Sequence, residues 1–73
     1  MERKEEVLRK FGKQLTALRT QKKLSIQELA MATGLDRVRI GKIEAGKVNL
    51  SFTTIVALAQ GLGIGPHELL STL

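Results

Sequence analysis

Residues that typically begin or end α-helices recur along this chain at short intervals, and they constrain the fold more than any other feature. Ser25 and Glu28 have the spacing of a capping box, in which a serine hydroxyl and a glutamate carboxylate satisfy free amides at a helix start. Glycine favours the left-handed conformation that closes a helix, and proline suits a first helical position. The expected start and stop residues are Ser25 and Gly34, Asp36 and Gly46, Ser51 and Gly63, and Pro66. They predict helices over about residues 25–33, 36–45, 51–62 and 66–71.

The segment before these helices has the apolar spacing of an amphipathic helix. Its apolar side chains recur at intervals of three and four residues and are Val7, Leu8, Phe11, Leu15 and Leu18. This pattern predicts a helix over about residues 5–21. No segment of the sequence shows the alternation of a half-buried strand. We therefore expect one all-α domain of five short helices over residues 1–73.

Size and residue types exclude several classes of protein. The chain has 73 residues, no cysteine and one histidine, His67, so disulfides and Cys/His zinc sites are excluded. A lone histidine without a nucleophile or carboxylate constellation predicts no enzyme, and no motif predicts a cofactor. No apolar run approaches the roughly 18 residues that cross a bilayer, and the charged N-terminus does not resemble an export signal. We expect a cytoplasmic protein that is stabilised by well-packed helices, a partner chain, or both.

The basic residues are confined to the first two thirds of the chain. Residues 1–47 contain all 12 lysines and arginines together with six acidic residues, whereas residues 48–73 contain no basic residue and one acid, Glu68. One part of the fold can therefore face a polyanion while the other serves a different purpose. With two phenylalanines and no tyrosine or tryptophan, the chain lacks the stacking residues of single-strand binders. Duplex nucleic acid is the favoured partner.

The helix expected over residues 36–45 has an unusual outward face. At 100° per residue, Ile40 and Ile43 define its buried side. Arginine and lysine can bind guanine in a major groove, valine can contact a thymine methyl group, and glycine permits close approach. Glycine and valine are poor helix formers, so a merely solvated face does not explain them. The residues predicted to read bases are Arg37, Val38, Gly41 and Lys42, and an ordinary cationic surface is the alternative.

The helices over residues 25–33 and 36–45 are separated by a tight turn that contains Gly34. This is the layout of a helix-turn-helix, in which the second helix lies in the major groove and the first crosses the DNA backbone. Free amides at the start of the first helix suit a phosphate. The residues expected to contact the DNA backbone lie in the two helices or beside them and are Lys22, Lys23, Ser25, Gln27, Asp36, Arg39, Lys47 and Asn49.

The charged residues near the N-terminus are expected to form a solvated helix face. Residues four apart in this segment have opposite charges, which predicts weak ion pairs such as Glu5–Arg9 and Glu6–Lys10. The same face includes Glu2. In the alternative, Arg3 and Lys4 form an arm that reaches the DNA backbone.

Three stretches of the sequence resemble the Xre-type helix-turn-helix domain of phage repressors, Cro proteins and small bacterial regulators. They are FGKQLTALRTQKKLSIQELA, ATGLDRVRIGKIEAGK and NLSFTTIVALAQGLGIGPHELL, and together they cover most of residues 11–70. The resemblance implies a lambda repressor-like five-helix fold that binds a palindromic operator in double-stranded DNA as a homodimer and regulates transcription. It implies an ion pair between Arg19 and Glu44, which have a structural role. The base-facing positions of the family fall on Asp36, Arg37, Val38, Gly41 and Lys42.

One position departs from this family. The family often has glutamine directly after the N-cap of the first motif helix, where it touches phosphate, but this chain has Ile26 there and Gln27 one place later. The contact then falls to Ser25, Gln27 or backbone amides. The runs at residues 35–37 and 49–51 look most like stand-alone regulators such as restriction–modification controller proteins.

The uncharged C-terminal third is expected to form the dimer surface. Its apolar residues exceed what a monomer of this size readily covers, and those assigned to the interface are Ile64, Leu69, Leu70 and Leu73. The alternative is that these residues close the core. A different functional class is an antitoxin-type interaction module, whose C-terminal surface neutralises a toxin and whose DNA binding serves autoregulation. A plain helical adaptor leaves the one-sided charge unexplained.

Overall fold

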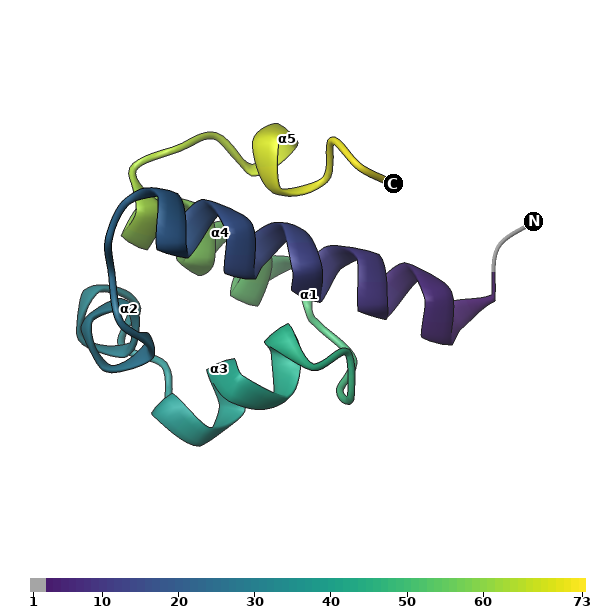
Figure 1. Cartoon of the computed structure of the whole chain (residues 1–73), viewed down its shortest axis with the longest axis horizontal. Coiled ribbons are helices and arrows are strands. Elements are labelled where there is room, and N and C mark those ends of the chain that lie inside the picture. Colours follow the sequence, from purple (N-terminus) through teal and green to yellow (C-terminus); the bar gives the residue numbers. More distant parts are fainter. Residues whose placement is uncertain (1–2) are drawn as a thin grey trace.

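The computed structural model describes residues 3–73, and Figure 1 shows that they form a bundle of helices. Residues 3–73 contain no β-strand, so the all-α prediction is confirmed. Glu2, which was expected in the charged N-terminal face, lies outside the described residues. The five helices are α1 (Lys4–Gln21), α2 (Ile26–Thr33), α3 (Arg37–Glu44), α4 (Phe52–Leu62) and α5 (Pro66–Leu69).

The helix ends coincide with the predicted caps. The Glu28 amide donates to Ser25 Oγ at 3.0 Å and the Ser25 amide donates to Glu28 Oε1 at 2.8 Å, which completes the capping box of α2. The side chains of Asp36 and Ser51 accept the corresponding amide hydrogen bonds at the starts of α3 and α4. The three glycines expected to close helices have positive φ and are Gly34, Gly46 and Gly63. Helix α5 is a single turn that ends before residue 71.

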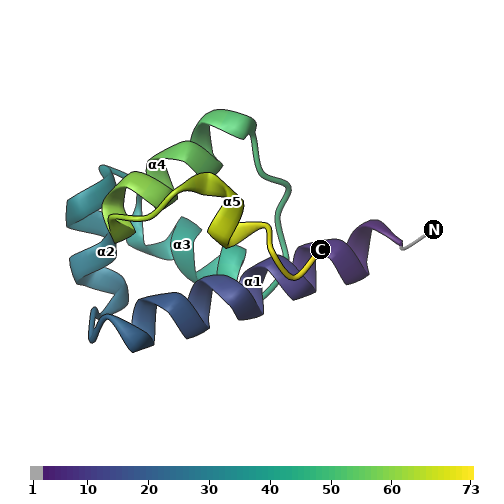
Figure 2. The same cartoon turned by 90° about the horizontal axis from the view of Figure 1, so that it is seen from above.

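The long helix α1 spans the molecule and packs directly against α3 and α5. In Figure 1, α3 lies below the left-hand half of α1, α5 lies above α1 and α2 closes one end, while Figure 2 shows α4 alongside α5. α2 packs against both α3 and α4. Every helix contributes to one core, which consists of Phe11, Leu15, Leu29, Ala30, Ile40, Ile43, Leu58, Ala59, Leu62 and Leu69.

Helices α1 and α3 approach each other closely at Gly12. A Cβ atom on Gly12 would lie 2.6 Å from the carbonyl oxygen of Ile43, which is closer than real side chains come to a backbone oxygen. Because that oxygen belongs to the α3 backbone, it cannot move aside without shifting the helix. Glycine at this position therefore sets the distance between α1 and α3.

The structure corrects the role predicted for Leu69. Leu69 has no exposed surface and belongs to the core, because α5 packs against both α1 and α4. It therefore closes the core, as the alternative interpretation held, and offers nothing to a partner chain. Ile64 is half-buried and packs against the same core, whereas Leu70 and Leu73 are exposed.

Candidate nucleic-acid interface

The turn between α2 and α3 is held by short-range contacts. Gly34 has φ +77°, and its amide donates to the Ala30 carbonyl at 2.9 Å. The Leu35 amide donates to Thr33 Oγ1 at 3.2 Å, and the Leu35 side chain packs against the core. The angle between α2 and α3 is therefore fixed, and the predicted helix-turn-helix layout is confirmed.

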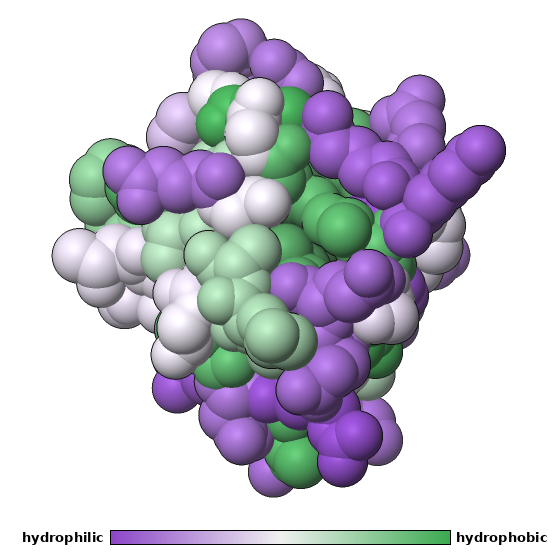
Figure 3. All heavy atoms as spheres, turned by 90° about the vertical axis from the view of Figure 1, so that its left-hand side faces the viewer, coloured by the Kyte–Doolittle hydropathy of each residue, from purple (hydrophilic) through white to green (hydrophobic). Residues whose placement is uncertain are grey.

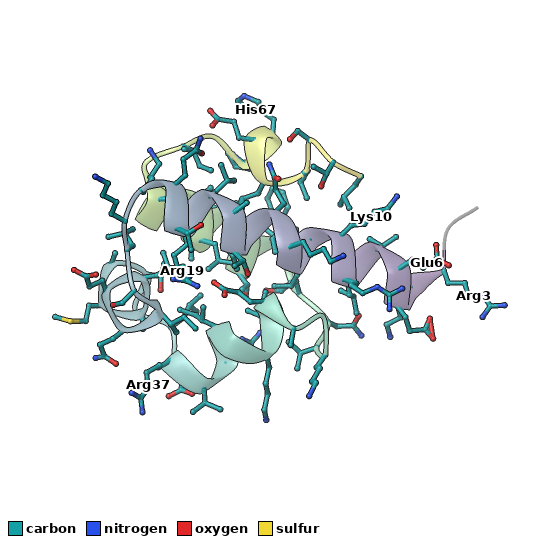
Figure 4. All side chains as sticks on the ribbon, in the orientation of Figure 1. Arg3, Glu6, Lys10, Arg19, Arg37 and His67 are labelled. Atoms are coloured by element: carbon teal, nitrogen blue, oxygen red, sulfur yellow. The ribbon has the colours of Figure 1, made fainter. Side chains whose placement is uncertain are left out.

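The outward face of α3 is exposed along its length. Ile40 and Ile43 point into the core, as predicted. Figure 4 shows Arg37 at the start of α3, pointing away from the body of the molecule. Lys42 is also exposed, and Val38 exposes 58% of its surface. The predicted base-reading side chains are therefore free to enter a groove.

Gly41 lies in the same face and serves no packing purpose within the described part of the chain. A Cβ atom there would meet no neighbouring atom within 4 Å. Glycine in a helix interior costs about 0.8–1.0 kcal/mol relative to alanine. The fold therefore gains nothing from this glycine, in contrast to Gly12.

An ion pair joins α3 to α1. Glu44 Oε2 accepts from Arg19 Nε at 2.7 Å and Glu44 Oε1 accepts from a terminal nitrogen of Arg19 at 3.1 Å, a bidentate arrangement. The other terminal nitrogen of Arg19 donates to the Leu24 carbonyl at 2.7 Å, in the turn before α2. Hydrogen bonding to Glu44 raises the pKa of Arg19 above its ordinary value. The side chains expose 13% and 9% of their surfaces, so the predicted pair is present and mostly buried.

The predicted backbone contacts lie at both ends of the α2–α3 unit. Lys22 and Lys23 precede α2, and Lys47 and Asn49 follow α3, and all four are exposed. Lys23 has φ +59°, a left-handed conformation that is uncommon for residues other than glycine. The backbone therefore accepts some strain where it presents this basic side chain.

Two residues predicted to contact the DNA backbone also act as helix caps. Ser25 takes part in the capping box of α2, and Asp36 Oδ2 accepts from the Arg39 amide at 3.2 Å. A carboxylate repels phosphate, so we assign Asp36 to the helix start. Arg39 is exposed.

The family's sequence profile matches residues 15–69 of the chain, and its description is "Helix-turn-helix". The chain belongs to the helix-turn-helix family. It is 42% identical over 59 residues to the transcriptional repressor RghR of Bacillus subtilis, a match that spans 80% of this chain but 43% of RghR. It is 40% identical over 63 residues to the control protein C.MunI of a Mycoplasma species, and the match spans 85% of each chain.

A solved structure supports the same placement. The restriction–modification controller protein C.AhdI of Aeromonas hydrophila superimposes with a TM-score of 0.84 at 48% identity, over 85% of this chain and 94% of that one. The similarity to controller proteins that residues 35–37 and 49–51 indicated is confirmed. Like its helix-turn-helix relatives, this domain is a DNA-binding transcription regulator and not an enzyme.

The family often has a glutamine at the position that Ile26 occupies in this chain, and Gln27 is the neighbouring residue expected to replace it. Ile26 is half-buried and packs against the core, so its side chain cannot make that polar contact. Gln27 and Arg37 instead line one open hollow of about 570 Å³ between α2 and the start of α3. The hollow also includes the exposed Met31 and the cap residue Asp36.

Sequence reasoning missed two residues, one that positions α3 and one that is exposed at the start of α4. Gly12 was not singled out, because the close approach of α3 depends on tertiary packing. Phe52 was treated only as the first residue of a helix, yet it exposes 72% of its surface. No signal in the sequence reveals this exposure, because Phe52 lies three residues before Ile55, at the spacing of a core position, and the core begins only further along α4.

Figure 3 shows hydrophilic side chains around a small hydrophobic spot at the lower end of the molecule, where α3 lies in Figure 1, and further hydrophilic side chains along the other edges of this view. None of the helices in residues 3–73 is long and apolar enough to cross a membrane. Among the same residues, no group of three or more histidine, cysteine or acidic side chains forms a metal site.

Proposed function

We propose that the protein binds a palindromic operator in double-stranded DNA as a homodimer and so controls transcription in the cytoplasm. The observation that carries this proposal is the exposed face of α3. Its side chains Arg37, Val38 and Lys42 are not used by the fold, and Gly41 leaves the helix backbone open to close approach. These residues are the ones that a helix in a major groove needs to discriminate bases.

Contacts to phosphate supply affinity and position the reading helix. Basic and amide side chains in the α2–α3 unit and at its two ends are suited to this task, whereas the Ser25 amide and hydroxyl are already engaged in the capping box. Each phosphate that is neutralised steepens the dependence of affinity on salt. The side chains proposed for these contacts are Lys22, Lys23, Gln27, Arg39, Lys47 and Asn49.

The homodimer rests on the exposed apolar residues of the C-terminal third. Phe52, Leu70 and Leu73 are exposed on a part of the chain that contains no lysine or arginine. A second copy would cover these side chains and set two α3 helices about one turn of DNA apart. Sedimentation tests this: we expect a dimer for the native protein and a monomer for Phe52→Ser. Met31→Ser, which removes an equally exposed apolar side chain from α2, is the control and should stay dimeric.

Selection of bound duplexes from a random pool, at two salt concentrations, tests the operator. We expect a palindromic motif whose half-site centres lie about 10 base pairs apart. Salt-sensitive binding without any motif would contradict base reading by α3. It would also direct attention to a protein partner, such as a toxin, at the uncharged C-terminal surface.

A further inference from the structure

We propose that Arg9, on α1, makes an additional contact to the phosphate backbone of the operator, beside the loop that follows α3. This inference rests on the proposed function. The sequence predicted that Arg9 belongs to a solvated helix face. The geometry of the chain after α3 points to a different role.

Helix α3 ends in a Schellman motif that turns the chain towards α1. The Gly46 amide donates to the Ile43 carbonyl at 3.0 Å, and the Lys47 amide donates to the Lys42 carbonyl at 3.0 Å. Gly46 has φ +73°, which this motif requires at its central residue. The motif therefore fixes the position from which Lys47 leaves the end of α3.

The turn rests on the backbone of α1 at Arg9. A Cβ atom on Gly46 would lie 2.9 Å from the Cα atom of Arg9 and 3.1 Å from its backbone nitrogen. Lys47 follows Gly46 directly, at a Cα–Cα distance of about 3.8 Å. Arg9 and Lys47 are far apart in the sequence, but their side chains start from neighbouring backbone positions.

The charge of Arg9 is not used within the described residues. Its side chain is exposed and forms no ion pair with any residue from 3 to 73, so the predicted pair with Glu5 is absent. A guanidinium group binds phosphate with two parallel hydrogen bonds. If Lys47 meets one phosphate at the end of α3, Arg9 starts close enough to Lys47 to meet another phosphate nearby on the same strand.

The test is the salt dependence of DNA binding by Arg9→Gln, measured on a duplex that carries the selected site and on a scrambled duplex. Loss of one phosphate contact reduces the slope of log affinity against log salt by about 0.9. Between about 50 and 200 mM salt, the native protein should then lose about 3.5-fold more affinity than the variant. The reduction should be equal on both duplexes, and Arg9→Lys should retain the native slope.

Lys13→Gln is the matched control. It removes one positive charge from the same helix, but Lys13 lines a hollow with Gln14 and Thr72 on the side of the C-terminal tail. The slope of log affinity against log salt for Lys13→Gln should equal that of the native protein. Thermal melts should show that Arg9→Gln and Lys13→Gln both fold. An unchanged slope for Arg9→Gln, or an equal reduction for Lys13→Gln, would overturn the role of Arg9 and leave the proposed function standing. A native protein that binds neither duplex would overturn both.

Discussion

Replacement of Gly41 by alanine separates what the fold needs from what DNA binding needs. A Cβ atom at this position meets no atom within 4 Å in residues 3–73, so the free protein can accept it without strain. Alanine is favoured over glycine in a helix interior by about 0.8–1.0 kcal/mol. For a domain of this size, 1 kcal/mol corresponds to a rise in melting temperature of about 4–8 °C. We therefore expect Gly41→Ala to be more stable than the native protein.

DNA binding should respond in the opposite direction. The added methyl group projects from the face of α3 that we propose approaches the bases, so it should hold the helix away from the groove floor. A tenfold loss of affinity for the selected site corresponds to about 1.4 kcal/mol, and we expect a loss of at least this order. Affinity for a scrambled duplex should change little, because phosphate contacts dominate there.

Two measurements suffice: thermal unfolding followed by circular dichroism, and titration of a labelled duplex followed by fluorescence anisotropy. Gly61→Ala is the control, because a Cβ atom on Gly61 would collide with the Thr33 side chain, and this variant should be destabilised. If Gly41→Ala bound the selected site as tightly as the native protein, close approach at residue 41 would be refuted. A loss of stability in Gly41→Ala would refute the argument from open space.

Further predictions concern the residues that hold or use α3. Arg19→Met should destabilise the protein by about 3 kcal/mol in urea unfolding, because it leaves the mostly buried Glu44 carboxylate without its partner. Hydrogen bonding to Glu44 raises the pKa of Arg19, so the stabilisation that its charge supplies should be fully present at neutral and mildly alkaline pH. It should be lost only as the pH rises through this raised pKa, which urea unfolding at several pH values would check. Gly12→Ala should lower the melting temperature, because the added methyl group displaces α3. Binding titrations should show that it also lowers affinity for the selected site. Arg37→Ala should cost about 1–3 kcal/mol on the selected site and relax one base position, whereas an equal loss on random duplex would show a phosphate contact instead.

The sequence was sufficient to predict the helices because their boundaries are set locally. Ser25, Asp36 and Ser51 cap their helices through amides three residues ahead, so neighbouring residues alone contain the signal. Leu69 was misassigned because an apolar residue near the chain end has the same pattern whether it packs inward or faces a partner. Its burial depends on how α5 folds back over α1 and α4, which is tertiary information.

The side of α3 that we propose faces the bases stands out in the sequence for a related reason: it breaks local rules that the rest of the chain obeys. Gly12 and Gly41 are both helical glycines, but the structure requires the first and has no use for the second. Lys23 adopts a left-handed conformation that glycine would adopt with less strain, and Val38 exposes an apolar side chain to water. All three exceptions lie in the α2–α3 unit or the turn that precedes it. A residue that opposes the local preference without helping the fold is expected at a binding site. The folded monomer therefore bears small local costs at the surface where we propose that DNA binds.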